Sequence, residues 1–306
     1  MAGPLTRAQL LGFAALCVIW GSTWLAIRLV VREVPPLDAA AIRFFAGAIL
    51  LLTIAVAQKR RWPAGEKQWN ALLVLSVTIM AVPYGLLFWA EQYVSSSMTA
   101  VLFSGMPLLV SLFTPLLLRR SVPRRALLAL LVGFGGLLLL FPSGLSASSS
   151  ALLGGIAILL AVILSAWSIV YAKYRLQDVD PVVATGIQLL FGSVVLFWGT
   201  WALEAHSHAL WTRTAVLALS FLVLFGSCAA FVIYYWLLKR MQPYQLATTS
   251  LITPVIAVLE GALFAHEAVP LLMVIAMAVV LGSVGTVLLS SQQQQSETGK
   301  VLLVQE

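Results

Sequence analysis

The chain has 306 residues, of which 61% are hydrophobic and only 9% are charged, and its mean hydropathy is +1.01. Soluble domains carry roughly 25% charged residues, because a compact globule must cover its surface with polar groups. The apolar excess therefore has to face lipid, which excludes a soluble enzyme or a soluble binding domain. The formal charge of +7 does not indicate a nucleic-acid partner, since the basic residues are scattered among short loops.

Ten segments stay apolar for about 20 residues, which is the length that an α-helix needs to cross the hydrocarbon core. In chain order they are Leu10–Val31, Leu37–Ala57, Trp69–Ala90, Ser97–Leu118, Pro123–Phe141, Leu152–Lys173, Pro181–Leu203, Arg213–Leu238, Tyr244–Phe264 and Val269–Ser290. The first segment is too long for a cleavable signal peptide and lacks a small-residue cleavage site, so we expect it to be retained. The sequence thus predicts an all-α integral membrane protein with ten transmembrane helices.

The distribution of basic residues predicts the orientation of these helices. If the N-terminus is cytoplasmic, most Lys and Arg fall in cytoplasmic loops, whereas Arg28, Arg32 and Arg213 lie on the other side. This bias is the positive-inside pattern of membrane proteins. Because the number of spans is even, both termini are predicted to be cytoplasmic.

The two halves of the chain match each other at a nearly constant separation. The matched pairs are Pro36 and Pro181, Gly47 and Gly192, Pro107 and Pro254, Pro123 and Pro270, and Gly135 and Gly282. Since each half holds an odd number of spans, matched helices must cross the membrane in opposite directions. We therefore expect a five-helix repeat over residues 1–145, an inverted five-helix repeat over 146–290 and a polar, disordered tail over 291–306.

Inverted repeats are a recurrent plan of secondary transporters. Two similar halves of opposite orientation can exchange conformations and so open one central site alternately to each side of the membrane. This architecture is the strongest functional indication in the sequence.

Six short motifs also occur in a characteristic order along the chain. They are Ile19-Trp20-Gly21-Ser22-Thr23-Trp24, Pro35-Pro36, Ala41-Ile42-Arg43-Phe44, Trp89-Ala90-Glu91-Gln92-Tyr93-Val94, Met106-Pro107-Leu108 and Thr253-Pro254-Val255-Ile256-Ala257-Val258. Together with His266-Glu267, where the family commonly has Gly-Glu, this order resembles the EamA-type branch of the drug/metabolite transporter superfamily. The resemblance implies a ten-helix inverted-repeat fold, a bacterial inner-membrane location and export of amino acids, related metabolites or toxic organic compounds.

Pro107 and Pro254 lie near the middle of spans four and nine. A proline inside a helix leaves the carbonyl four residues earlier without its helical donor, here the carbonyls of Phe103 and Ser250. At this depth a free carbonyl is tolerated only against protein or a hydrated cavity. We therefore predict central helix breaks at both prolines, with Phe103 and Ser250 at a binding site; a packed kink without a ligand is the alternative.

Several aromatic side chains lie deeper than the interfacial belt. A buried indole N–H has to find a partner or line a hydrated cavity. The sequence therefore predicts an apolar pocket with a few polar groups, although ordinary helix packing is the alternative for each member. The predicted wall consists of Trp20, Ser22, Trp24, Tyr84, Phe88 and Trp167.

Arg43 is a charged residue inside span two, where charge is costly and indicates function. Its repeat mate is the polar Gln188, and Glu91 and Glu260 lie near the outer ends of spans three and nine. Arg43 either pairs with one of these carboxylates as an extracellular gate or binds a substrate carboxylate with its forked guanidinium. Snorkelling to the headgroups is the alternative. Arg43, Glu91 and Gln188 are included among the candidate substrate-binding residues.

The predicted function is that of a secondary transporter that exports small organic metabolites, such as neutral or aromatic amino acids, related metabolites or drugs, by alternating access. A facilitative channel-like permease or a membrane scaffold without active coupling is the alternative. A membrane-embedded enzyme is not expected, because the sequence contains no catalytic or nucleotide-binding motif.

The expected partners are a small-molecule substrate and the lipid bilayer, without nucleic acid, and the expected assembly is a monomer or a weak homodimer. No cofactor or metal site is expected, because Cys17 and Cys228 lie in apolar stretches. Two options stay open for energy coupling, namely protons as the coupling ion or facilitated efflux down a gradient.

Overall fold

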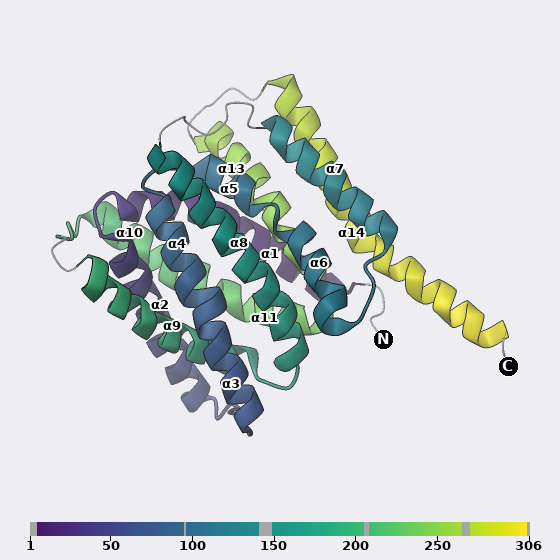
Figure 1. Cartoon of the computed structure of the whole chain (residues 1–306), viewed down its shortest axis with the longest axis horizontal. Helices are drawn as coiled ribbons and strands as arrows, with labels where there is room; N and C mark the ends of the chain where they lie inside the picture. The colour runs from purple at the N-terminus through teal and green to yellow at the C-terminus, as the bar shows by residue number, and fades with distance from the viewer. Residues whose placement is uncertain (1–4, 95, 141–148, 205–207, 265–269, 305–306) are drawn as a thin grey trace.

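The computed structural model describes residues 5–94, 96–140, 149–204, 208–264 and 270–304, and these are helical apart from short connections (Figure 1). The helices in chain order are α1 (Arg7–Val31), α2 (Pro36–Ala57), α3 (Glu66–Leu75), η1 (Ser76–Ala81), α4 (Val82–Ala90), α5 (Ser96–Phe103), α6 (Met106–Leu118), α7 (Arg124–Leu140), α8 (Ser149–Arg175), α9 (Pro181–Leu203), α10 (Arg213–Phe221), η2 (Leu222–Ala229), α11 (Ala230–Arg240), α12 (Pro243–Ala247), α13 (Thr249–Phe264) and α14 (Leu271–Val304).

These helices form ten spans across the described residues. Span three is α3–η1–α4, span four is α5–α6, span eight is α10–η2–α11 and span nine is α12–α13. Eight of the ten spans are long and apolar enough to cross a membrane by length and composition, and α7 and α12–α13 supply the other two. The prediction of an all-α, ten-helix membrane protein is confirmed, with helix ends shifted by a few residues.

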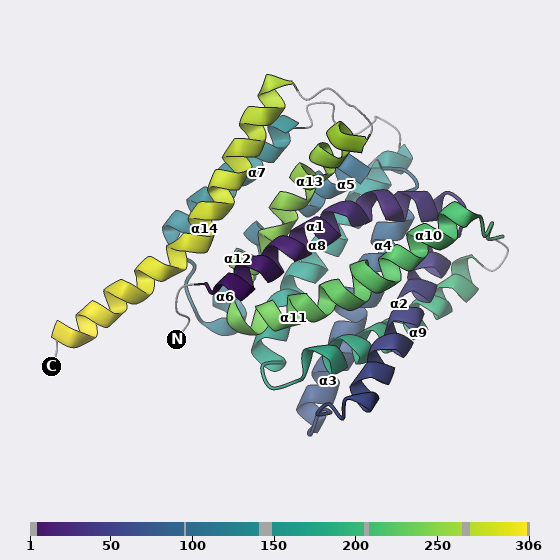
Figure 2. The same cartoon turned by 180° about the vertical axis from the view of Figure 1, so that it is seen from behind.

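Capping residues define where several helices begin. Thr6 and Gln9 form a capping box at the start of α1, and the carboxylate of Asp180 accepts two backbone N–H groups at the start of α9. Pro36 and Pro181 occupy the first turns of α2 and α9, where the missing N–H has no helical partner to lose. The start of α1 and the end of span ten lie at the same end of the bundle (Figures 1 and 2).

The repeat mates α2 and α9 pack against each other and run in opposite directions. At one end, the Glu204 carboxylate, just after α9, accepts the backbone N–H groups of Leu37 at 3.0 Å and Asp38 at 3.1 Å. At the other end, Arg60, just after α2, forms an ion pair with Asp180 at 3.0 Å. The first turn of each helix is therefore held by a residue that follows the other helix.

Spans three and eight each contain a π-helical segment at a matching position, η1 and η2. Matched glycines pack against them. A Cβ on Gly192 would lie 2.7 Å from Met80 Cβ in η1, and a Cβ on Gly47 would lie 3.4 Å from Cys228 Sγ in η2. Each π-helical segment thus packs against the second helix of the opposite repeat, where glycine permits a close approach.

Spans four and nine are both interrupted, but only one interruption lies at the predicted proline. Pro107 stands in the first turn of α6, after a break at Ser104 and Gly105. Pro254 lies inside α13, and the break in span nine comes earlier, at Thr248. The expected break at Pro254 is displaced because the Ser250 carbonyl, which Pro254 leaves free, accepts the Thr253 hydroxyl at 3.2 Å.

Helices α7 and α14 form a pair at the edge of the bundle (Figures 1 and 2). They approach closely at Gly133, whose Cβ would meet Ser283 Oγ. The tail from residue 291 was expected to be disordered, whereas α14 continues as a helix through Val304 and projects beyond the other helices (Figure 1). An existing helix extends without a new nucleation step, and Gln and Glu are good helix formers.

The surface of the bundle is apolar, as expected for a protein whose solvent is lipid. Leu11 is 71% exposed and Leu116 is 68% exposed, whereas Ala39, Ala40 and Ala48 of α2 are fully buried. Small residues therefore fill the close helix contacts of α2, and large aliphatic residues such as Leu11 and Leu116 face outward to lipid, which a soluble surface would disfavour.

We predict that Gly192→Ala destabilises the protein. The added Cβ would meet Met80 Cβ at 2.7 Å and the Ser76 carbonyl oxygen at 3.2 Å, and overpacking of this kind costs about 1–3 kcal/mol. The midpoint of thermal unfolding in detergent should fall. Gly135→Ala is the matched control, because no neighbouring atom lies within 4 Å of that Cβ. Equal midpoints for the two variants would contradict this close packing of α9 on η1.

Candidate functional site

A cavity of about 80 Å³ lies inside the bundle, which is space for several water molecules. It is lined by Trp20, Thr23, Trp24, Ile27, Arg43, Ile79, Tyr84, Leu87, Phe103, Met106, Ser165, Ile169, Phe231, Tyr234, Ala247, Thr249, Ser250 and Thr253. These residues come from spans one to four of the first repeat and from spans six, eight and nine of the second. Both repeats therefore build the cavity, while the peripheral α7 and α14 contribute no lining residue.

Six of the residues predicted from the sequence as substrate-binding line this cavity. They are Trp20, Trp24, Arg43, Tyr84, Phe103 and Ser250. The other five, Ser22, Phe88, Glu91, Trp167 and Gln188, are not among the lining residues. The structure thus brings together about half of the predicted set and distributes the rest among neighbouring contacts.

Arg43 is the one charged residue that lines the cavity in the described part of the chain, and it is only 1% exposed. Its Nε donates to the Ser227 hydroxyl of η2 at 2.7 Å. The guanidinium also lies over the rings of Phe44, Tyr84 and Phe88, at 5.2 to 5.8 Å from their centres. These contacts hold the side chain in place by cation–π attraction and one hydrogen bond.

Neither of the two ion pairs considered for Arg43 forms. Among the described residues the structure contains one ion pair, Arg60 with Asp180. Glu260 instead accepts a hydrogen bond from the Ser22 hydroxyl, and Glu91 is buried at the end of span three, 2% exposed. Glu91 and Glu260 belong to the outer ends of their helices, whereas Arg43 is held at η2.

Two polar atoms of the lining residues are buried without a hydrogen-bond partner, Nη1 of Arg43 and the hydroxyl of Tyr234. Tyr234 lies 2% exposed on α11, with its ring 5.4 Å from that of Trp20 and 6.5 Å from that of Phe231. Both are donors. Buried donors are nearly always paired in proteins, so this pair indicates where a ligand could bind.

Hydroxyl groups of span nine supply the other polar part of the cavity. Thr249 and Ser250 donate to the carbonyls of Leu246 and Ala247 at 3.0 and 2.9 Å. The hydroxyl protons are thereby used within the helix, while the oxygens keep lone pairs that can accept a hydrogen bond.

The mates Arg43 and Gln188 occupy matching positions but have different partners. The Gln188 side chain accepts from the Tyr235 hydroxyl at 2.6 Å and donates to the Ala184 carbonyl at 3.1 Å. Gln188 is therefore satisfied by protein groups. Trp167 stacks on Tyr171 with ring centres 4.8 Å apart and does not line the cavity.

Several lining residues were not predicted from the sequence as part of a site, among them Thr23, Ser165, Phe231, Tyr234 and Thr249. Phe231 is separated from Tyr84 by the same number of residues as Pro254 from Pro107, so the repeat itself could have indicated it. Tyr234 follows Phe231 by one helical turn. Thr23 belongs to the first motif, between Ser22 and Trp24, so its position there could have indicated it. Ser165 and Thr249 carry no charge and lie in no motif, so no sequence signal distinguishes them from packing residues.

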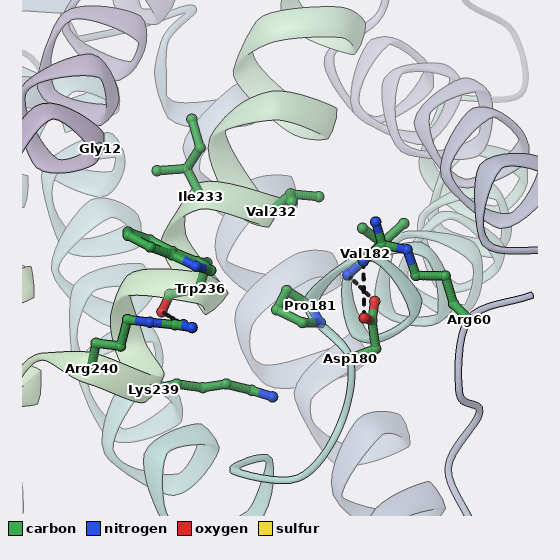
Figure 3. A pocket seen from close by; sticks show the side chains of 10 residues that line it. All are labelled: Gly12, Arg60, Asp180, Pro181, Val182, Val232, Ile233, Trp236, Lys239 and Arg240. Atoms are coloured by element: carbon green, nitrogen blue, oxygen red, sulfur yellow. Dashed lines mark hydrogen bonds and ion pairs between the residues drawn. The ribbon is translucent and has the colours of Figure 1, made fainter. Parts of the chain in front are cut away.

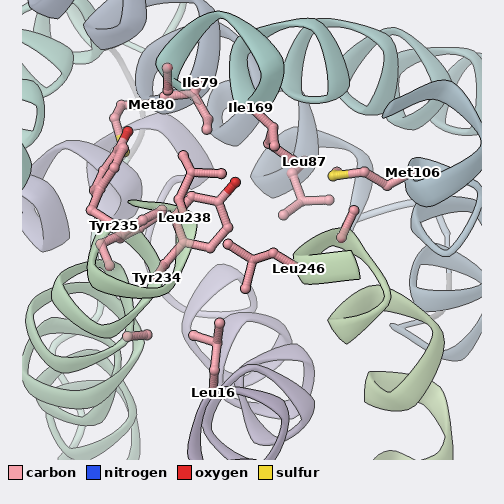
Figure 4. Close-up of a cluster of buried hydrophobic side chains, with 14 of the residues drawn as sticks. Leu16, Ile79, Met80, Leu87, Met106, Ile169, Tyr234, Tyr235, Leu238 and Leu246 are labelled. Carbon is pink, nitrogen blue, oxygen red and sulfur yellow. The ribbon is translucent and has the colours of Figure 1, made fainter. Parts of the chain in front are cut away.

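On the side assigned to the cytoplasm, a layer of fully packed side chains closes the cavity. Leu16, Leu238 and Leu246 come from α1, α11 and α12 and point into one cluster with Met80 and Tyr235 (Figure 4). Each of the five is at most 3% exposed. A solute in the cavity would need this layer to separate before it could exchange with the cytoplasm.

A second hollow of about 440 Å³ opens near the cytoplasmic ends of α1, α9 and α11. Arg60, Lys239 and Arg240 surround it together with Asp180, and Trp236 forms one wall (Figure 3). The two hollows share no lining residue. The cytoplasmic hollow is therefore more basic than the central cavity, which is mostly aromatic and aliphatic.

The chemistry of the central cavity is that of binding. In the described part of the chain no His, Cys, Asp, Glu or Lys lines it, so it offers no general base, no nucleophile paired with a base and no set of metal ligands. Its aromatic walls, hydroxyl oxygens and single guanidinium suit recognition of a small amphipathic molecule.

Comparisons with known proteins agree with this architecture. The chain is 29% identical over 262 residues to the uncharacterized transporter YoaV of Bacillus subtilis, with coverage of 84% of this chain and 89% of YoaV. It is 32% identical over 250 residues to the uncharacterized inner membrane transporter YedA of Escherichia coli K12, with coverage of 81% and 79%. A crystal structure with 20% identity covers 92% of this chain and 97% of its own at a TM-score of 0.76, which shows a shared fold.

The EamA-like transporter family matches this chain twice, over residues 7–141 and 152–290. The two matches fall on the two sets of five spans, and they account for nearly all of the described helices. The chain therefore belongs to the EamA-like transporter family and is a multi-pass membrane transporter, not an enzyme.

Proposed function

We propose that this protein is a secondary transporter that exports small organic solutes across the bacterial inner membrane by alternating access of the central cavity. The observation that carries the proposal is the matched pair of π-helical segments, one in each repeat, at the positions where the two repeats contact each other. The inner-membrane location rests on the similarity to YedA, which is named an inner membrane transporter.

Each π-helical segment offers a backbone carbonyl to a side chain of the opposite repeat. Trp20 of span one donates to the Gly226 carbonyl of η2 at 3.4 Å. Ser168 of span six donates to the Thr78 carbonyl of η1 at 3.0 Å. Spans one and six are repeat mates, so the two bonds join corresponding spans across the inverted repeats.

These hydrogen bonds between the π-helical segments and the opposite repeat support alternating access for a physical reason. π-Helical turns leave a helix locally wide and are frequent at functional sites. A conformational change that loosens η2 against span one and tightens η1 against span six would convert one arrangement into its mirror across the membrane. The packed layer of Leu16, Leu238 and Leu246 would be the closed cytoplasmic side in the arrangement described here.

The size and lining of the cavity support a small amphipathic solute as the transported molecule. Neutral or aromatic amino acids, related metabolites and drugs fit this description. Protons are a candidate coupling ion, and the buried Glu91 is a candidate carrier for them. A facilitative channel-like permease and a membrane scaffold are the competing functions, and they differ from a transporter in measurable ways.

We predict that the purified protein, reconstituted in proteoliposomes, takes up labelled small solutes and that unlabelled solute inside the vesicles accelerates this uptake. Alternating access requires the site to return across the membrane, and a loaded site returns faster than an empty one when the empty return is slow. The measurement is initial uptake of labelled neutral and aromatic amino acids and of their deaminated acids, with and without internal solute and with and without a pH gradient.

The same measurement separates the alternatives. A channel-like permease would give uptake without acceleration by internal solute, and a scaffold would give no uptake above protein-free vesicles. Dependence of net accumulation on the pH gradient would identify protons as the coupling ion, whereas equilibration alone would identify facilitated efflux.

We further predict that a cysteine in the cytoplasmic layer reacts at a rate that depends on the transported solute. Leu246→Cys, in a background with Cys17→Ser and Cys228→Ala, should react slowly with a membrane-impermeant maleimide added from the cytoplasmic side, because Leu246 is fully buried. Solute should change this rate about threefold or more by changing the population of the open layer. Lys59→Cys, in an exposed cytoplasmic turn, is the control whose rate should not change. A solute-independent rate at Leu246→Cys would contradict the proposed movement.

A further inference from the structure

The electrostatics of the central cavity are set by one residue. Arg43 is 1% exposed and lines the cavity, and no other charged side chain does so in the described part of the chain. Its guanidinium has one hydrogen bond, to Ser227, and no described carboxylate forms an ion pair with it. The cavity therefore holds one positive charge without a protein counter-ion.

The surrounding aromatic rings do not complete the coordination of this charge. Phe44, Tyr84 and Phe88 attract the guanidinium through their faces, but a ring face does not fix a guanidinium N–H as a carboxylate does. Nη1 of Arg43 has no hydrogen-bond partner, and the hydroxyl of Tyr234, which lines the same cavity, has none either. Two buried donors at one cavity require an acceptor, and no described residue supplies it.

We propose that Arg43 and Tyr234 bind the carboxylate of the transported solute, and that this solute is a small organic monoanion with an apolar or aromatic body. The inference rests on the proposed transport function and narrows its substrate class. The planar fork of an arginine matches the two oxygens of a carboxylate, and the Tyr234 hydroxyl donates to the same group.

The charge and the aromatic lining of the cavity explain why the solute should be a monoanion with an apolar or aromatic body. The cavity holds one unpaired positive charge, so a bound monoanion makes the loaded cavity electrically neutral. A neutral loaded cavity can then be closed on both sides of the membrane while the protein changes conformation. Trp20, Trp24 and Phe103 supply an aromatic wall for the body of the molecule, and Trp24 and Phe103 pack edge to face at 5.6 Å.

The same lining disfavours two other classes of solute. An amine or a polyamine would meet the Arg43 charge in an environment of low dielectric constant, where like charges repel strongly. The ammonium group of an amino acid would find hydroxyl oxygens, such as those of Ser250 and Thr253, and aromatic faces, but no carboxylate, because no Asp or Glu lines the described cavity. The carboxylate is therefore the required group and the ammonium is dispensable.

The experiment compares head groups on a constant body. The full-length purified protein is titrated with 3-phenylpropionate, 3-phenylpropionamide, 3-phenylpropylamine and phenylalanine, and with the corresponding series built on 3-methylbutanoate, by isothermal calorimetry and thermal shift up to millimolar concentrations. We expect the acids to bind, and the amides and amines to bind about tenfold more weakly or worse, as expected for a charge-assisted hydrogen bond. Equal binding of acid and amide, or no binding of either acid, would overturn the proposal.

Variants test the two donors separately. Arg43→Gln should weaken acid binding by about tenfold or more, Arg43→Lys should restore part of it, and Tyr234→Phe should weaken it severalfold. Arg28→Gln is the matched control, because Arg28 is a half-buried arginine of α1 that does not line the cavity. Unchanged acid binding in Arg43→Gln would overturn the assignment. If Arg43→Gln does not fold, the head-group comparison in the unmodified protein decides.

The outcomes distinguish this inference from the proposed transport function. Uptake that internal solute accelerates, without preference for acid over amide, would support the transporter and refute the carboxylate site. Acid binding that depends on Arg43, without any uptake in proteoliposomes, would support the carboxylate site and refute the proposed transport.

Discussion

The structure depends on one constraint, that every backbone N–H and C=O within the hydrocarbon needs a partner inside the protein. Lipid offers none, so the chain is helical wherever it faces outward. Departures from regular α-helix occur at η1, η2 and the breaks at Ser104–Gly105 and Thr248. These lie where helices of both repeats meet around the cavity, and side chains such as Trp20 and Ser168 supply donors to their carbonyls. Irregular backbone therefore marks the part of the bundle that can change its hydrogen bonds without exposing them to lipid.

Buried charged groups need partners even more than backbone amides do, because burying an ion costs more free energy than burying an amide. Three charged groups at the ends of α2 and α9 have protein partners: Glu204 accepts backbone donors, and Arg60 pairs with Asp180. Arg43 is the exception, since three aromatic rings and one serine contact it but no carboxylate neutralises it. Unlike Glu204, Arg60 and Asp180, Arg43 thus keeps a hydrogen-bonding group available for a bound molecule.

Much of this fold could be predicted from the sequence. Lipid requires long apolar spans, the positive-inside bias gives the orientation of those spans, and the constant separation of matched residues reveals the repeat. The site was harder to predict, since a lining residue differs from a packing residue only by the direction of its side chain. Arg43 was identified because charge within a span is rare, whereas Tyr234 and Thr249 look like ordinary helix residues. Pro254 shows the limit of a local rule: the carbonyl it frees is taken by Thr253, and the helix breaks at Thr248 instead.

The repeats are alike in backbone but not in chemistry, and this difference has a consequence for transport. In the proposed alternating access, the equivalent π-helical segments and equivalent glycines are what would allow the two halves to exchange conformations. If Arg43 and its mate Gln188 were also equivalent, a solute would bind equally well in two opposite orientations. Gln188 is instead satisfied by Tyr235 and Ala184, which leaves one guanidinium on one side of the cavity. Under the proposed mechanism, a symmetric scaffold would therefore move a solute that is held by one end throughout the conformational change.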